Sequence, residues 1–105
     1  LASQQDHSLE PVWCKKDQRN FSANAKLICS TPSLWGLEAR NVALYFDHKG
    51  ALKRAGYTTA LEANKKRLKA WLKERKACED DLQCTAETYR RRIAELEALS
   101  RKGGY

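Results

Sequence analysis

The sequence lacks the features that would indicate a membrane-spanning protein, a β-sheet protein or an enzyme. No apolar stretch approaches the roughly 20 residues that span a bilayer, and no useful run alternates apolar and polar residues as strands do. We recognise no Ser-His-Asp set, metal-ligand cluster or phosphate-binding loop. Acidic pairs such as Asp80 and Asp81 are better explained by helix capping. We therefore expect a non-enzymatic protein without a cofactor or a metal.

The chain also has no methionine, not even at position 1, and no signal-peptide pattern at its start. We expect a mature or trimmed form from which a signal peptide has been removed. A length of 105 residues fits one domain with a modest core, and 42% hydrophobic residues argue against wholesale disorder. The formal net charge of +7 favours anionic partners or surfaces.

Four cysteines in so small a chain predict two disulfides and therefore an oxidising compartment. We favour the local pairs Cys14–Cys29 and Cys78–Cys84, because each closes one corner between predicted helices. A crossed pairing that joins the first and last corners remains an alternative. Structural zinc is a weaker interpretation, since the spacings C-x14-C and C-x5-C are unlike the short ligand pairs of zinc sites.

Capping signals and helical periodicity predict three main helices preceded by a short one. Ser22 can cap the short helix, Thr31-Pro32 marks the start of the second, and Gly56 fits its end. An acidic segment just before Leu82 suits the start of the last helix. The expected ranges are 23–28, 31–55, 58–77 and 82–99.

We therefore expect an all-α fold, a small disulfide-linked antiparallel helical bundle. The helical domain is expected to cover residues 13–100, between an irregular arm over residues 1–12 and a flexible tail over residues 101–105. Helical spacing assigns apolar stripes to the two central helices. The stripes are Leu34, Leu37, Val42, Tyr45 and Leu52 on the second helix, and Leu61, Leu68, Trp71 and Leu72 on the third.

Lysines recur at three- and four-residue steps along the third predicted helix and therefore share one side of it. These residues, here called the lysine face, are Lys66, Lys69, Lys73 and Lys76. One interpretation is a solvated surface that keeps the protein soluble; the other is a docking strip for phosphate, a lipid headgroup or an acidic protein. Nucleic acid is the weakest partner class, because no nucleic-acid-binding motif accompanies the charge. A second basic cluster covers residues 90–92.

The aromatic residues divide between the core and its margins. Trp71 and Tyr89 lie on apolar stripes and are expected in the core, and Trp13 is expected to cover a disulfide because it precedes Cys14. Trp35 lies beside an inward face, so two interpretations remain. We favour packing against the N-terminal arm; the alternative is an exposed Trp that anchors a binding interface.

Arg75 and Glu38 are predicted to form an ion pair. Arg75 follows Trp71 by four residues and so lies on the core side of its helix, while Glu38 is adjacent to the core stripe of the second helix. A buried guanidinium without a partner is costly. The alternative is that Arg75 extends its charged end to water.

Three segments, taken in order, resemble a known family. Residues 27–38, LICSTPSLWGLE, resemble the pattern I-C-x-x-P-x-L-x-x-L-[DE]. Residues 70–78, AWLKERKAC, resemble W-[LI]-x-x-R-x-x-C, and residues 84–96, CTAETYRRRIAEL, resemble C-x4-Y-x-x-R-I-x-x-L. The set is similar to the LprI-like lysozyme-inhibitor N-terminal domain family of small secreted or periplasmic bacterial proteins and lipoproteins. The resemblance covers about residues 13–99.

This resemblance implies an all-α fold and a location in the bacterial cell envelope, periplasmic or secreted. Several residues match its motif positions, and we interpret them as fold determinants. They are Cys14, Cys29, Glu38, Trp71, Arg75, Cys78, Cys84, Tyr89 and Arg92, with Glu38 at a position that is often Asp.

Two binding functions follow as hypotheses. The first is inhibition of a lysozyme or another muramidase, in which an exposed segment such as residues 1–12 or 47–58 fits a cleft and one Lys or Arg meets the two catalytic carboxylates. Long-range repulsion opposes it, because animal C-type lysozymes are basic as well. The second is an envelope-associated module whose lysine face binds anionic lipid, lipopolysaccharide or an acidic protein, with steep salt dependence.

Overall fold

The computed structural model describes residues 9–102, and all regular structure in that range is helical. The prediction of an all-α protein is confirmed. The expectations for residues 1–8 of the arm and residues 103–105 of the tail lie outside the described residues. The elements are η2 (Val12–Lys15), α1 (Ala23–Cys29), η3 (Pro32–Leu34), α2 (Trp35–Ala55), α3 (Thr58–Ala77) and α4 (Leu82–Arg101).

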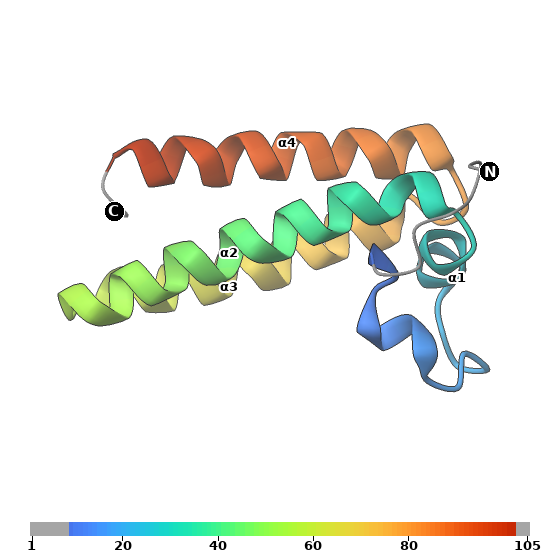
Figure 1. The fold of residues 1–105 in the computed structure, drawn as a ribbon, viewed down its shortest axis with the longest axis horizontal. Helices are drawn as coiled ribbons and strands as arrows, with labels where there is room; N and C mark the ends of the chain where they lie inside the picture. Colours follow the sequence, from blue (N-terminus) through green and yellow to red (C-terminus); the bar gives the residue numbers. More distant parts are fainter. Residues whose placement is uncertain (1–8, 103–105) are drawn as a thin grey trace.

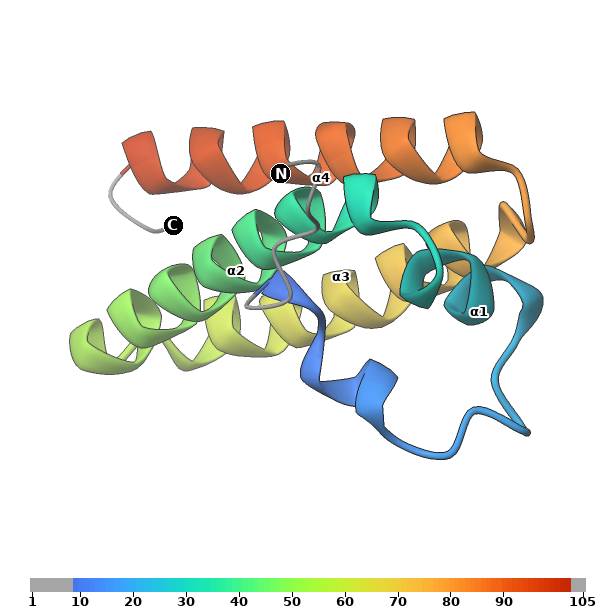
Figure 2. The same cartoon turned by 45° about the vertical axis from the view of Figure 1, so that its right-hand side comes forward.

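Three long helices run side by side in this part of the chain (Figure 1). α2 leads away from the end where α1 lies, α3 returns beside it, and α4 runs in the same direction as α2 (Figure 1). In both views α4 diverges from the α2–α3 pair towards the α2–α3 connection (Figures 1 and 2). The α2–α3 connection therefore forms one end of the molecule, opposite α1.

Local hydrogen bonds explain where the helices begin and end. The hydroxyl of Ser22 accepts a hydrogen bond from the Ala25 amide at 3.1 Å and caps α1, as predicted. Gly56 ends α2 in the left-handed region at φ 75°, where a residue without Cβ is strongly favoured. The amide of Tyr57 then donates to the Leu52 carbonyl at 3.0 Å, which satisfies a carbonyl of the last turn.

The start of α2 differs from the prediction. Pro32 begins a single 3-10 turn, and the α-helix starts at Trp35. Thr31 makes no capping hydrogen bond with its side chain; instead its hydroxyl donates to the Leu27 carbonyl at 2.6 Å. Gly50 lies within α2 and does not interrupt it.

Both favoured disulfides are present. Cys14 pairs with Cys29, and Cys78 pairs with Cys84, each with 5.5 Å between the Cα atoms. The first bond ties η2 to the last residue of α1, and the second spans the α3–α4 connection. On the chain-entropy model, a closed loop of about 15 residues contributes about 3 kcal/mol to stability.

The hydrophobic core lies at the end of the molecule near α1. Its buried residues are Ile28, Leu34, Trp71, Ala86 and Tyr89. The rings of Trp71 and Tyr89 lie 5.5 Å apart at a tilt of 58°, so the prediction that both are core residues is confirmed. Because this cluster joins α1, η3, α3 and α4, the α2–α3 connection is left outside the main core.

Two residues of the predicted apolar stripes are exposed. Val42 is 40% exposed and Leu72 is 38% exposed. The reason on α2 is that polar residues occupy much of its buried side. That side consists of Trp35, Glu38, Asn41, Tyr45, His48 and Leu52. The buried residues of α2 follow regular helical spacing, but apolar periodicity does not identify this side because several of them are polar.

Candidate functional site

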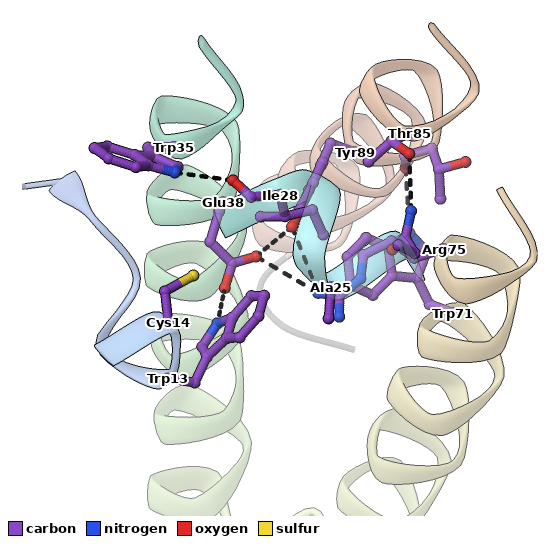
Figure 3. A network of polar contacts seen from close by, with 12 residues as sticks. Trp13, Cys14, Ala25, Ile28, Trp35, Glu38, Trp71, Arg75, Thr85 and Tyr89 are labelled. Atoms are coloured by element: carbon purple, nitrogen blue, oxygen red, sulfur yellow. Dashed lines mark hydrogen bonds and ion pairs between the residues drawn. The ribbon is translucent and has the colours of Figure 1, made fainter. Parts of the chain in front are cut away.

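A buried carboxylate, that of Glu38, organises contacts from three other elements (Figure 3). Its Oε1 accepts a 2.6 Å hydrogen bond from the Tyr89 hydroxyl, and its Oε2 accepts a 3.1 Å hydrogen bond from the Trp13 indole N–H. The predicted ion pair is present as well, with 3.8 Å between Oε1 and Arg75 Nη1. We call Trp13, Glu38, Trp71, Arg75 and Tyr89 the Glu38 network.

Arg75 is held between two indole rings. Its guanidinium carbon lies 5.5 Å from the ring centre of Trp13 and 5.6 Å from that of Trp71, within the range of cation–π attraction. Burial, reinforced by the charge of Glu38, raises the pKa of Tyr89, so the phenol stays protonated and donates to Glu38. These contacts occupy the carboxylate and fix η2 against the helices, which is a structural role.

The sequence missed this role of Trp13. We expected it to cover a disulfide, but its N–H bonds to Glu38 and its ring lies 5.9 Å from that of Phe21. The resemblance to the family motifs marks Glu38, Arg75 and Tyr89 but says nothing of position 13. A tryptophan beside a cysteine on a 3-10 turn gives no sequence signal of a polar partner 25 residues away.

Trp35 is buried, so its interpretation as an exposed interface anchor is wrong. It is only 4% exposed, and its indole N–H donates to the Ile28 carbonyl at 2.9 Å. Side chains in the first turn of a helix point back towards its N-terminus, which directs this ring onto α1. Trp35 therefore belongs to the fold and not to a binding surface.

Exposed apolar side chains gather over the Glu38 network. Val12 is 77% exposed and Phe46 is 57% exposed. We call the set the apolar strip; it comprises Leu9, Val12, Val42, Phe46 and Leu72. Two neighbouring hollows join its members, because Val42 lines both the hollow beside Leu9 and Val12 and the one beside Phe46 and Leu72. Exposed apolar patches of this kind mark interaction sites in many soluble proteins.

A groove lined in part by lysines continues from this strip along α2 and α3. Its volume is about 540 Å³, within the usual range of ligand sites. We call it the basic groove; its apolar lining is Tyr45, Leu61, Leu68 and Leu72, and its charged lining is Lys49, Lys53, Lys65, Lys69 and Glu62. The buried Asn64 also lines it. The sequence did not reveal this site, because half of its lysines come from each helix of the pair.

The four residues of the lysine face are exposed on α3, but they do not share one hollow. Lys69 lines the basic groove, whereas Lys73 and Lys76 line a separate hollow next to Ser22 and Asn24 of the α1 region. Lys66 lines neither. The lysine face is therefore an exposed side of α3 whose residues border two different hollows.

The end of the α2–α3 hairpin protrudes. Residues 53–59, here called the hairpin end, are all exposed, and they include the cations Lys53 and Arg54 and the aromatic Tyr57. The turn is fixed on both sides, because the Tyr57 amide donates to Leu52 and the Tyr57 carbonyl accepts from the Leu61 amide at 2.9 Å. The hairpin end is thus an exposed, cationic turn whose backbone is hydrogen-bonded on both sides of Tyr57.

The basic cluster at residues 90–92 divides between surface and interior. Arg90 and Arg91 are exposed, but Arg92 is only 1% exposed. Arg92 Nη1 lies 3.3 Å from Oε2 of Glu95, and Glu95 is itself held by Arg67 through hydrogen bonds of 2.9 and 3.0 Å. The hydrogen bonds from Arg67 hold the pKa of Glu95 below its usual value.

Within residues 9–102, no group of three or more His, Cys, Asp or Glu side chains is arranged to hold a metal ion. None of the helices described there has the length and apolar character needed to cross a membrane.

Comparisons with models of protein families, with curated proteins and with solved structures find no match to this chain.

Proposed function

We propose that this chain is a non-enzymatic binding protein of an oxidising compartment, secreted or periplasmic, that inhibits a lysozyme or another muramidase. The two disulfides support the compartment, because such bonds persist where thiols are not kept reduced. The resemblance to the LprI-like lysozyme-inhibitor family supports the class of target. The inhibitory element in this proposal is the hairpin end.

The hairpin end carries the proposal because its exposure and charge suit a glycosidase cleft. A retaining or inverting glycosidase places two carboxyl groups on either side of the bond that it cleaves. An exposed segment presenting Lys53 and Arg54 can meet these groups with opposite charge. Tyr57, 41% exposed, adds an aromatic side chain of the type enriched at the centres of interfaces.

Rigidity favours binding by this segment. An element that is already ordered loses less conformational entropy when it binds. The left-handed turn at Gly56 and the backbone hydrogen bonds on either side of Tyr57 fix the hairpin end before it meets a partner.

The net positive charge opposes binding to a basic enzyme, but this repulsion acts over longer distances than the contact between Arg54 and a cleft carboxylate. The charge of +7 repels a cationic lysozyme at a distance, and physiological salt screens exposed charges beyond about 8 Å. A direct contact between Arg54 and a cleft carboxylate is screened much less. We therefore expect inhibition to persist at physiological salt.

The test is residual muramidase activity while the purified, oxidised protein is titrated into several lysozymes at low and at physiological salt. The proposal predicts stoichiometric inhibition of at least one enzyme that persists at physiological salt. If every enzyme keeps full activity at a molar excess of the protein, the proposal is wrong.

The basic groove favours a second candidate, an envelope-associated module that binds anionic lipid. Its apolar lining suits an acyl chain, and Lys49, Lys53, Lys65 and Lys69 suit a negatively charged headgroup. Lipopolysaccharide combines the same two chemistries. Sedimentation with vesicles tests this candidate: anionic vesicles should retain the protein, and neutral vesicles should not.

A matched pair of variants locates the lipid site. Replacing Lys65 and Lys69 with Ser removes two charges from the groove, whereas replacing Lys73 and Lys76 with Ser removes two from the same helix elsewhere. The candidate predicts loss of vesicle binding for the first pair only. Equal losses would indicate nonspecific attraction to the surface charge.

A further inference from the structure

A small cavity lies where α2, α3 and α4 meet; it begins next to the hairpin end at Ala60 and shares Asn64 with the basic groove. Its volume is about 270 Å³. α2 contributes His48, α3 contributes Ala60, Ala63, Asn64 and Arg67, and α4 contributes Arg92, Glu95 and Leu99. The lining thus combines the apolar side chains of Ala60, Ala63 and Leu99 with several side chains that can donate hydrogen bonds.

Arg92 is the buried charge in this lining, and most of its donors are unpaired. The residue is 1% exposed, and none of its Nε, Nη1 and Nη2 atoms makes a hydrogen bond. Its ion pair is the 3.3 Å contact between Nη1 and Glu95. Buried polar groups in proteins nearly always have hydrogen-bond partners, and a buried charge without them is costly.

Glu95 gives Arg92 only the 3.3 Å ion-pair contact, and Arg67 donates to both of its oxygens. Arg67 donates from Nε to Oε2 at 2.9 Å and from Nη2 to Oε1 at 3.0 Å. The outer Nη1 of Arg67 is directed instead to Glu74, at 2.8 Å, and Glu74 does not line the cavity. Glu74 and Glu95 together balance the charges of Arg67 and Arg92, but neither carboxylate gives Arg92 a hydrogen bond.

His48 is a second residue of the lining with an unpaired buried nitrogen. The residue is 6% exposed, and its Nδ1 has no hydrogen-bond partner. Burial and the nearby charge of Arg92 lower the pKa of His48, so the imidazole is neutral near pH 7 and has one N–H to donate. The charged groups that share the cavity with it are Arg67 from α3 and Arg92 and Glu95 from α4.

We propose that this cavity binds one small monocarboxylate. The unpaired atoms of Arg92 are all donors, so the ligand must supply acceptors, and the guanidinium fork matches a carboxylate in bidentate geometry. The side chains of Ala60, Ala63 and Leu99 leave room for a short aliphatic portion. This site is independent of the proposed inhibition of a muramidase.

The experiment is a titration of the full chain with sodium acetate and sodium propionate at constant ionic strength, with chloride as the balancing anion. The Nε–H signal of Arg92 and the ring signals of His48 are followed by NMR. Saturable shifts at both residues are expected, together with a melting temperature that rises with ligand concentration. The bound carboxylate should also raise the pKa of His48 relative to its value in chloride alone.

A matched pair of variants separates the cavity from general effects of salt. Ala60→Leu fills the cavity without altering its charge, and Ala70→Leu makes the same change on an exposed position of the same helix. We expect the first to weaken carboxylate binding by about tenfold or more and the second to leave it unchanged. If Ala60→Leu does not fold, Ala63→Leu replaces it, because Ala63 lines the same cavity and is exposed.

Three results would overturn the proposal. The first is the absence of saturable shifts at Arg92 in wild-type protein. The second is that chloride alone produces the same NMR shifts and the same rise in melting temperature. Such a result would show that ionic strength, and not binding of a carboxylate, causes these changes. The third is preferential binding of inorganic phosphate, which would show that the cavity selects another anion.

Discussion

Tyr89 of α4 donates its hydroxyl proton to Oε1 of Glu38 on α2 across 2.6 Å in the interior of the protein. A hydrogen bond to a charged group contributes about 1.5–3 kcal/mol. Replacing Tyr89 with Phe should therefore lower the free energy of unfolding by that amount, as measured by urea denaturation. Tyr45→Phe is the matched control, because no hydrogen bond of its hydroxyl is found among the described residues, and it should cost less than about 0.5 kcal/mol.

A double-mutant cycle tests whether the two residues act together. Glu38→Gln combined with Tyr89→Phe should cost less than the sum of the single changes, because the first change already removes the charged acceptor. Strict additivity would mean that the hydrogen bond contributes nothing to stability.

The two disulfides should differ in what they contribute. The loop closed by Cys14 and Cys29 spans 15 residues and that closed by Cys78 and Cys84 spans 6. The chain-entropy model gives about 3 kcal/mol for the first and about 2 kcal/mol for the second. Double Cys→Ser variants compared by urea denaturation should follow this order, and the reverse order would contradict it.

Stability should fall as pH drops below about 6.5, because of His48. Its pKa is lowered in the folded protein from the ordinary value of 6.5, so the unfolded chain takes up the proton first and is favoured as pH decreases. The contribution of neutral His48 to stability is complete above the pKa of His48 in the unfolded chain. It is lost as pH falls through the pKa of His48 in the folded protein. Glu95, also lowered, acts in a more acidic range because its ordinary value is 4.5.

The measurement is the urea midpoint of wild-type protein and of His48→Gln between about pH 7.5 and pH 5.5. The variant should vary less with pH than the wild type over this interval. Parallel curves for the two proteins would assign the pH dependence to other groups.

The burial of Trp35 leads to a prediction about stability and not about binding. Trp35→Ala should lower the free energy of unfolding by about 3–5 kcal/mol, whereas Phe46→Ala, at an exposed position, should change it far less. Circular dichroism during urea denaturation measures both. A Trp35→Ala protein of normal stability that has lost partner binding would contradict the burial described here.

The secondary structure of this chain was largely predictable because its signals are local. Ser22 and Gly56 mark helix ends through hydrogen bonds and backbone angles within a few residues, and the disulfide corners follow from their position between helices. The orientation of α2 was less predictable. Its buried side carries Glu38, Asn41 and His48, so apolar periodicity assigned Val42 to the core, where it does not lie.

The candidate sites were harder to predict than the fold, because they arise between helices. The pairing of Glu38 with Arg75 followed from two residues that each lay near a core stripe. By contrast, the basic groove is formed by lysines of both α2 and α3, and the cavity at Arg92 is lined by residues of three helices. Neither site can be predicted without knowing how the helices pack. Residues 90–92 look alike in sequence, and only packing distinguishes the buried Arg92 from its exposed neighbours.

The most direct test of the proposed function compares two charge-matched variants in the muramidase assay at physiological salt. Lys53→Ser with Arg54→Ser removes two charges from the hairpin end, and Lys66→Ser with Lys73→Ser removes two from the exposed side of α3. We expect the first variant to inhibit at least about tenfold less strongly than the wild type, and the second to inhibit as well as the wild type. Full inhibition by the hairpin-end variant, or an equal loss in both, would contradict the proposal.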